Sequence, residues 1–232
     1  VYQMFREKHF PYITGKYRQD GDLPERDCDM ILEGNERVMF VELKKCPLPG
    51  SYEQADDVDV LSALGAGMLY AQEQILWHKL RLKEKGVLAL YDKEGNHIQD
   101  YTPGKKPVIA MSICMPEYDF LTDRMMTETF LESILRVTYH AIDPSQEKKL
   151  DKLNKRTENI RMVTARLFDG MKYTTRDVFY NSLFRSLQQV WTMLRVCDTL
   201  DVFLDMCATQ LVMITGAGDV YVDIWNALQL KG

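Results

Sequence analysis

Close cysteine pairs are missing from the 232-residue sequence, whose five cysteines are scattered at positions 28, 46, 114, 197 and 207. Without a pair at the spacing of a zinc knuckle, and with an odd count, neither a structural zinc site nor a disulfide framework is expected. A long hydrophobic run is missing too, because the most apolar late stretch, residues 202–214, is interrupted by Asp205 and Gln210. That stretch is too short to cross a bilayer. These absences predict a reduced, cytoplasmic protein that does not span a membrane.

An excess of basic residues is also lacking, since the net charge is −5 and the pI is about 5.5. A protein that wraps nucleic acid through a broad surface is usually basic, so this composition argues against an architectural nucleic-acid binder. It argues less against a metal-dependent nuclease, whose carboxylates are offset by bound cations. The hydrophobic share of 46% is enough for one substantial core, or for a core domain and a smaller module.

Two short apolar runs, residues 30–32 and 38–41, are joined by a polar segment that contains Gly34 and Asn35. A glycine at the first turn position suits a type II′ turn, so the pattern predicts a β-hairpin. If the strands pair about a Gly34-Asn35 turn, the numbers of paired residues sum to 69. Asp29 is then opposite Phe40.

Charged side chains gather on one face of this predicted hairpin. In the same register Asp27 is opposite Glu42, and Asp29 is diagonal to Glu42 at roughly 7–8 Å. Lys44 follows Glu42 by two residues and points the same way. Two carboxylates and an ammonium on one face suit a hard divalent cation and a phosphate, because magnesium prefers oxygen ligands. A solvated face with a cross-strand ion pair is the alternative, and Asp27 is a candidate ligand in place of, or beside, Asp29.

Hydrophobic periodicity predicts a mixed α/β unit over residues 1–117. The expected elements are a helix that stops at Pro11, a strand at 12–17, the hairpin, a helix at 58–85 capped by Gly86, and strands at 87–91 and 107–114. Small residues at 63–67 are expected to let the long helix approach a sheet closely.

Residues 118–232 are predicted to form a mostly helical module. Helices are expected at 125–141, at 146–168, and once or twice over 176–207, followed by a hairpin or returning strand at 210–225. The predicted fold class is therefore α/β (α+β), with a mixed sheet core flanked by helices and a helical module after it.

The segment from Glu25 to Leu32 and the segment from Val41 to Lys45, in this order of elements, resemble the PD-(D/E)XK nuclease superfamily. Further residues are similar to a group of uncharacterised bacterial proteins: Cys46-Pro47-Leu48, Ala71-Gln72-Glu73-Gln74 and His78. The resemblance covers roughly residues 1–115. The proline that gives the superfamily its name has no counterpart next to Asp29, since Pro24 lies five residues earlier.

The resemblance implies a restriction-endonuclease-like core that hydrolyses phosphodiester bonds with Mg²⁺, or with Mn²⁺ in its place. It implies a set of site residues: Asp29 and Glu42 as metal ligands, Leu43 as a ligand through its carbonyl, Lys44 as the catalytic lysine, Glu7 from the first helix, and Gln72, or else Gln74, from the helix after the hairpin. An ordinary lysine has a pKa near 10.4, so Lys44 is expected to act through its charge and not as a base. A packed or capping role for His78 is the alternative to a place in the site.

Basic residues outside the hairpin supply candidates for nucleic-acid contact: Lys45, Lys148, Lys152, Lys155 and Arg156. Lys149 and Arg161 belong to the same run, and a solvated helix face is the alternative. The leading prediction is a Mg²⁺-dependent nuclease acting on DNA, with the helical module used for substrate positioning, for a homodimer or for a partner protein. Two alternatives stay open, a degenerate nuclease fold that serves as a scaffold and a nuclease acting on RNA.

Overall fold

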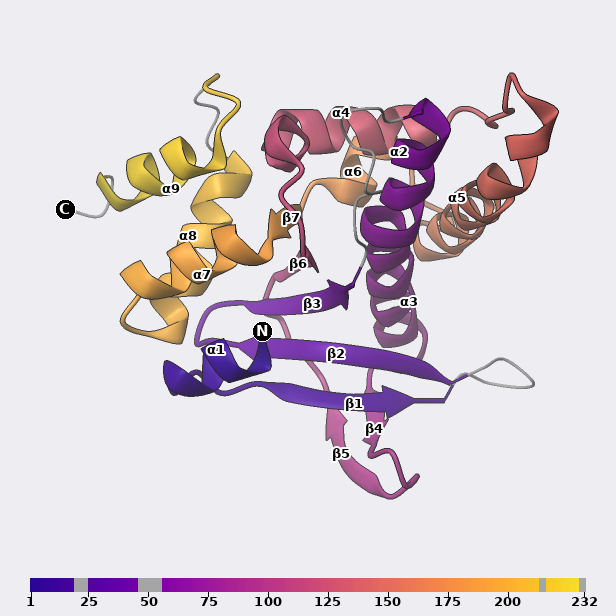
Figure 1. The fold of residues 1–232 in the computed structure, drawn as a ribbon. Helices are drawn as coiled ribbons and strands as arrows, with labels where there is room; N and C mark the ends of the chain where they lie inside the picture. Colours follow the sequence, from indigo (N-terminus) through magenta and orange to yellow (C-terminus); the bar gives the residue numbers. More distant parts are fainter. Residues whose placement is uncertain (19–24, 46–55, 213–215, 230–232) are drawn as a thin grey trace.

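The computed structural model describes residues 1–18, 25–45, 56–212 and 216–229 and contains one mixed seven-stranded sheet. The strand order is β5-β4-β1-β2-β3-β6-β7, and helices flank the sheet (Figure 1). The strands are β1 Ile13–Tyr17, β2 Arg26–Glu33, β3 Val38–Lys44, β4 Leu88–Tyr91, β5 His97–Tyr101, β6 Val108–Cys114 and β7 Ser182–Ser186. The predicted α/β class is confirmed.

Helices account for most of the remaining described residues. They are α1 Tyr2–Glu7, α2 Asp57–Leu64, α3 Tyr70–Lys85, α4 Arg124–Ile134, α5 Glu147–Leu167, α6 Thr175–Phe179, α7 Leu187–Val196, α8 Leu200–Val212 and α9 Val220–Gln229. A π-helical turn, η2 Gly65–Leu69, joins α2 to α3, and the short 3₁₀ turns are η3 Asp119–Thr122 and η4 Pro144–Gln146. In the described ranges no helix is both long enough and apolar enough to cross a membrane.

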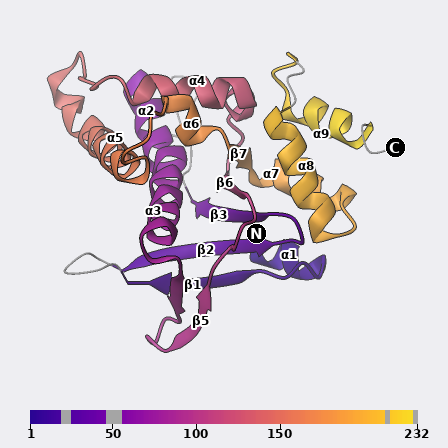
Figure 2. The ribbon, with the colours of Figure 1, turned by 180° about the vertical axis from the view of Figure 1, so that it is seen from behind.

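Each face of the central strands packs against its own set of helices. Met30, Met39 and Val41 face a core that includes residues of α1, α7, α8 and α9. Ile31 and Phe40 face the other way, against Ile75 of α3. The two views in Figures 1 and 2 agree that α3 stands on one side of the sheet, with α5 beside it, and α7 to α9 lie on the other.

The predicted helix at 58–85 is present as the continuous series α2, η2 and α3, and it ends at Gly86, whose φ of +73° is the expected left-handed cap. The reason predicted for its small residues needs correction at Gly65. A Cβ added there would lie 2.9 Å from Leu153 Cδ1, so this glycine permits close approach of α5. Because α2 and α3 pack along α5, that approach helps to hold α3 against the rest of the protein.

The second half of the chain differs from its prediction in three places. Ser182–Ser186 forms β7 inside the segment predicted as helix, and it pairs in parallel with β6. Every residue of β7 is buried, so the alternation that marks a half-exposed strand is missing from its sequence. The hairpin or returning strand predicted at 210–225 is wrong, because α8 ends at Val212 and α9 begins at Val220. The helix predicted at 125–141 ends at Ile134.

The structure also joins the two predicted domains into one sheet. β7 lies in the predicted helical module, 118–232, yet it completes the sheet of the predicted core, 1–117. Strand β5 was not predicted at all, and it pairs with β4 at the far edge. The predicted segment at Cys46-Pro47-Leu48 and Pro24 lie outside the described residues.

Candidate functional site

The hairpin register differs from the predicted one by two residues, and the difference brings Asp29 nearer to Glu42. Met30 pairs with Val41 and Glu33 with Val38, so the paired numbers sum to 71 and not to 69. Gly34 N–H donates to the Arg37 carbonyl at 3.0 Å, which places Asn35 and Glu36 in the turn. Since a shift of two residues keeps every side chain on its face, Asp29 and Glu42 still share a face. Continued one step past Met30–Val41, the last pair of the ladder, this register would set Asp29 opposite Glu42 and not diagonal to it.

A bulge in β2 sets the direction of Asp29. Ile13 pairs with Ile31 and Gly15 with Cys28, so β2 has one more residue than β1 between these pairs. Bulges of this kind re-aim side chains and are frequent beside functional sites. Cys28 and Ile31 therefore lie in the same core cluster although they are three positions apart, a spacing that puts them on opposite faces of a regular strand.

The same bulge removes Asp27 from the site. Asp27 was predicted to share a face with Asp29 and Glu42, but the extra residue turns it to the opposite face. There it lies 3.5 Å from Lys16 Nζ and is largely exposed. The structure therefore does not bring Asp27 together with Glu42 and Lys44, as the regular hairpin predicted.

Lys44 lies between the two carboxylates. Its Nζ is 3.0 Å from Glu42 Oε2 and 3.6 Å from Asp29 Oδ2, and its side chain is only 10% exposed. The ammonium thus occupies a place that suits positive charge between two oxygens. The predicted grouping of Asp29, Glu42 and Lys44 on one face is confirmed.

The two carboxylates have pKa values displaced in opposite directions. Burial and the nearby Glu42 charge raise the pKa of Asp29 to about 6. Burial also acts to raise the pKa of Glu42, but the hydrogen bonds and charges of His78 and Lys44 outweigh it and hold that pKa below its ordinary value. Glu42 therefore favours its ionised form, whereas Asp29 gains or loses its proton at a pH of about 6. Such divergent pairs are typical of functional sites.

His78 and Tyr17 form a buried chain behind Glu42. His78 Nε2 is 2.8 Å from Glu42 Oε1, and His78 Nδ1 is 2.8 Å from the Tyr17 hydroxyl. Burial raises the pKa of Tyr17. An ionised carboxylate can only accept a hydrogen bond, so the N–H at His78 Nε2 donates to Glu42. One oxygen of Glu42 is thereby held by His78, and the other faces Lys44.

The backbone around Leu43 completes the oxygen-rich face. Leu43 N–H donates to Asp29 Oδ2 at 2.8 Å. In a strand the N–H and C=O of one residue project toward the same neighbour, so the Leu43 carbonyl also faces the gap beside Asp29. Tyr2 donates its hydroxyl to the Asp29 carbonyl at 2.9 Å, which fixes the bulge from the α1 side.

Two residues implied by the resemblance are engaged elsewhere. Glu7 is exposed on α1 and accepts a hydrogen bond from Gln3 Nε2 at 2.8 Å. Gln72 is buried, donating to Ser112 Oγ at 3.1 Å and accepting from Ser182 Oγ at 3.0 Å. Gln72 therefore ties α3 to β6 and β7, and Tyr2 is the α1 side chain that contacts the site. Gln74 is buried on α3, and no contact with the carboxylates is shown for it.

Arg156, a member of the predicted basic set that lies far from the hairpin in sequence, is brought beside the site by the fold. The ring of Tyr70 lies 4.6 Å from Lys44 Nζ and 3.7 Å from Arg156 Cζ, measured to its centroid. Arg156 also pairs with Glu73 at 3.1 Å. Further along, Lys148, Lys152 and Lys155 are exposed at helical spacing on α5, and Lys45 is exposed after β3.

The remaining members of the basic run have structural partners. Lys149 pairs with Asp59 of α2. Arg161 donates to the carbonyls of Leu135 and Val137. These contacts leave Lys148, Lys152 and Lys155 as the face of α5 open to a ligand.

The donor set fits a magnesium ion. Mg²⁺ commonly binds through one or two carboxylates, and it fills its octahedron with water and substrate phosphate. Asp29, Glu42 and the Leu43 carbonyl offer such a partial shell of hard oxygen ligands. No group of three His, Cys, Asp or Glu side chains suited to a metal ion occurs in the part of the chain that the structure describes.

Sequence reasoning missed Tyr2, Tyr17 and Tyr70. The signal for the Tyr17 chain lay in His78, which extends the buried stripe of α3 by three residues from Ile75. A histidine on such a face needs a polar partner, and the sheet supplies one at each ring nitrogen. Comparison of the chain with protein-family models, curated proteins and solved structures finds no match.

Proposed function

We propose that this chain is a Mg²⁺-dependent nuclease with a restriction-endonuclease-like core, acting on DNA. The observation that carries the proposal is the position of Lys44 Nζ, 3.0 Å from Glu42 Oε2 and 3.6 Å from Asp29 Oδ2, where the β2–β3 ladder has ended. Two carboxylates and an ammonium at the open end of the hairpin, beyond its last paired residues, suit a cation and the phosphate that bridges to it.

Each residue has a defined task in this proposal. Asp29 and Glu42, with the Leu43 carbonyl, hold the cation, which when bound supplies charge neutralisation at the phosphate and activation of a water. Lys44 pairs with a non-bridging phosphate oxygen and stabilises the charge that develops there. His78 holds one oxygen of Glu42 so that the other faces the substrate side. Arg156 and the exposed lysines of α5 extend positive charge away from the site.

The test is a cleavage assay on labelled duplex DNA, single-stranded DNA and RNA of one sequence, with Mg²⁺ or Mn²⁺. Wild-type protein is expected to cleave, while Asp29→Ala and Lys44→Ala are expected to lose about 10²–10³-fold, the scale for removal of a group that stabilises transition-state charge. Lys106→Ala is the matched control, because Lys106 pairs with Glu33 at 2.7 Å at the other end of the same hairpin. Equal cleavage by the wild type, Asp29→Ala and Lys44→Ala contradicts the proposal.

A scaffold function is the second candidate, and one observation favours it. Glu42 is 0% exposed, and both of its oxygens are already engaged by His78 and Lys44, as in an internally satisfied polar cluster. A scaffold predicts no saturable Mg²⁺ or Mn²⁺ binding that is lost in Glu42→Ala. Calorimetric titration of both proteins separates the two candidates.

A further inference from the structure

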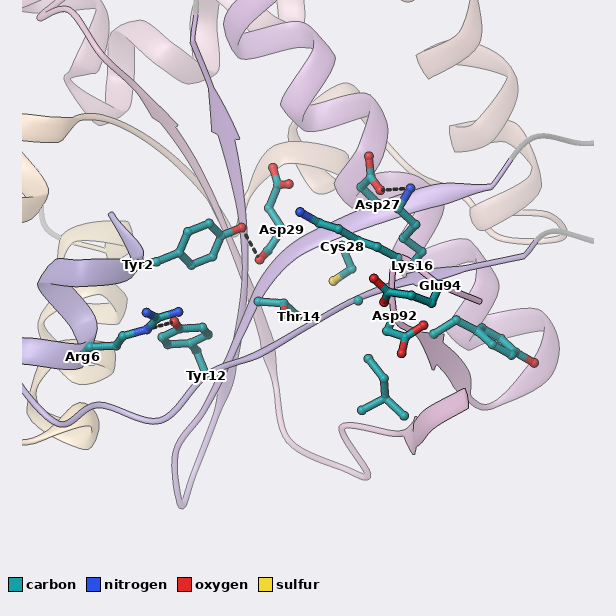
Figure 3. Close-up of a pocket in the computed structure, with 14 residues that line it drawn as sticks. Tyr2, Arg6, Tyr12, Thr14, Lys16, Asp27, Cys28, Asp29, Asp92 and Glu94 are labelled. Carbon is teal, nitrogen blue, oxygen red and sulfur yellow. Dashed lines mark hydrogen bonds and ion pairs between the residues drawn. The ribbon is translucent and has the colours of Figure 1, made fainter. Parts of the chain in front are cut away.

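A cleft of about 700 Å³ opens beside the carboxylate site, between α1, strands β1 and β2, and the β4–β5 turn (Figure 3). Its volume lies within the roughly 300–1,000 Å³ that small-molecule sites occupy. Asp29 belongs both to the lining of this cleft and to the carboxylate site. Asp29 is therefore the residue at which the cleft and the carboxylate site meet.

One wall of the cleft is aromatic. Tyr2 and Tyr12 pack with ring centroids 5.6 Å apart, and Arg6 Nε donates to the Tyr12 hydroxyl at 2.7 Å. Both hydroxyls are engaged, since Tyr2 donates to the Asp29 carbonyl, so the ring surfaces are what the wall offers to a ligand. Aromatic rings beside an arginine form the kind of platform on which unpaired bases stack.

The charges of the cleft are mixed, which suits a single nucleotide better than a continuous polyanion. Three basic side chains, Arg6, Lys16 and Lys93, line it together with four acidic ones, Asp27, Asp29, Asp92 and Glu94. Two of its acids serve the protein itself, since Asp27 pairs with Lys16 and Asp92 accepts two hydrogen bonds from Asn96 in the turn. Ile98 and Tyr91 add apolar surface from the β4–β5 side.

The aromatic wall is linked to the carboxylates through Tyr2. Its hydroxyl lies 2.9 Å from the Asp29 carbonyl oxygen. Burial first, and then the charges of Asp29 and Glu42, raise the pKa of Tyr2 to about 12, which places its hydroxyl within the field of both carboxylates. The aromatic wall therefore lies directly beside Asp29.

Resting on the proposed function, we propose that this cleft binds one unpaired nucleotide next to the scissile phosphate, by stacking its base on Tyr2 and Tyr12. Bases inside a duplex are stacked on each other and cannot reach such a wall. The substrate class is therefore single-stranded nucleic acid, or a strand with a displaced base, and an intact duplex is disfavoured.

The probe is a single-stranded oligodeoxynucleotide carrying the fluorescent base 2-aminopurine, with a fully paired hairpin of the same sequence for comparison. Titrations use the full chain carrying Lys44→Ala in the presence of Mg²⁺, so that cleavage does not consume the probe. Stacking on a tyrosine is expected to quench the fluorescence. Tyr12→Ala is expected to weaken single-strand affinity about tenfold, in the range measured for loss of one stacked base.

Matched variants keep the outcome interpretable. Tyr12→Phe retains the ring and is expected to bind within about twofold of the parent protein, which separates stacking from a folding defect. Tyr173→Ala removes an exposed tyrosine outside the cleft and is expected to change nothing. Equal loss of single-strand and hairpin affinity in Tyr12→Ala, an unquenched probe, or no binding of the probe overturns the proposal.

The cleft and the nuclease proposal fail in different ways. If wild-type protein cleaves no substrate but Tyr12 still governs single-strand binding, the cleft stands and the nuclease proposal falls. If duplex is cleaved at least as fast as single strand and Tyr12→Ala is silent, the nuclease proposal stands and the cleft proposal falls.

Discussion

His78 Nε2 lies 2.8 Å from Glu42 Oε1, and neither side chain is more than 1% exposed. A carboxylate buried to this degree is costly unless it is paired and hydrogen-bonded. His78 therefore has two effects on Glu42. It stabilises the ionised carboxylate in the interior, and by holding Oε1 it leaves Oε2 directed toward Lys44.

Replacement of His78 is expected to destabilise the fold, because Glu42 then remains buried without its hydrogen-bond donor. His78→Leu leaves Glu42 without its buried donor and is expected to lower the free energy of unfolding by about 3 kcal/mol. His78→Gln retains an amide donor and is expected to lose about half as much. Urea unfolding measures both. Adding Glu42→Gln to His78→Leu should recover part of the lost stability. If it recovers none, and if His78→Leu and His78→Gln lose equal stability, His78 does not stabilise the Glu42 charge.

The affinity of the site for Mn²⁺ is expected to depend on pH through Asp29. Its pKa is raised to about 6 by burial and by Glu42, and a carboxyl must lose its proton to bind a metal. Affinity is therefore expected to fall about tenfold per pH unit as pH drops below about 6, and to level off above it. Calorimetry across this range measures the effect, and a flat profile contradicts the assignment. Asp29→Asn is the control, in which the dependence should disappear.

The same raised pKa has a defined consequence for stability. The folded protein binds the Asp29 proton more tightly than the unfolded chain does, so this group contributes stability that is fully present below its ordinary pKa. The contribution is lost as pH rises through about 6. Asp29→Asn is expected to remove this dependence from the free energy of unfolding.

Gly34→Ala is expected to destabilise the fold without affecting the site. The φ angle of Gly34 is not positive, so the glycine is not needed for a type II′ turn. It is needed because an added Cβ would lie 2.7 Å from Leu204 Cδ1 and would also meet Asp201 of α8. A loss of about 1–3 kcal/mol in urea unfolding is expected from such overpacking. Glu36→Ala in the same turn is the control, and equal stabilities for the two variants contradict the account.

The exposed lysines of α5 are expected to contact phosphate. Lys152→Gln and Lys155→Gln should each weaken nucleic-acid binding and lower the dependence of log affinity on log salt concentration by about 0.7–0.9. Titrations at several salt concentrations measure the slope. Lys105→Gln, in the exposed segment between β5 and β6, is the control. If the salt dependence is unchanged in both α5 variants, the substrate does not contact this face of α5.

The hairpin and the long helix were predictable because their signals are local. Alternation and helical period identified which residues face which side, and that was enough to group Asp29, Glu42 and Lys44. The register could not be predicted from Gly34, because the hairpin turn packs against α8, which lies more than 160 residues later in the sequence. Asn35 N–H, for example, donates to Asp201 Oδ1 at 2.7 Å. The predicted register was wrong by two residues, which leaves each side chain on its predicted face of the hairpin. The predicted grouping of Asp29, Glu42 and Lys44 was therefore still correct.

The parts that sequence reasoning missed depend on tertiary contacts. Strand β7 is fully buried in a parallel pair, so its five residues carry no alternation to distinguish them from a helix. Asp27 was misplaced because a single extra residue in β2, set by pairing with β1, reverses its face. Gln72 has the residue type of a site residue, but Ser112 and Ser182 already bind both ends of its amide.

The central claim is tested most directly by calorimetric titration of Mn²⁺ into wild-type protein and into Glu42→Gln near neutral pH. Saturable binding by the wild type is predicted, with a loss of at least about tenfold in Glu42→Gln, because the variant keeps the shape of the side chain and removes its charge. Lys106→Ala, at the far end of the hairpin, should bind as the wild type does. Equal affinity of wild type and Glu42→Gln, or no saturable binding by either, contradicts the claim that the Asp29–Glu42 pair is a cation site.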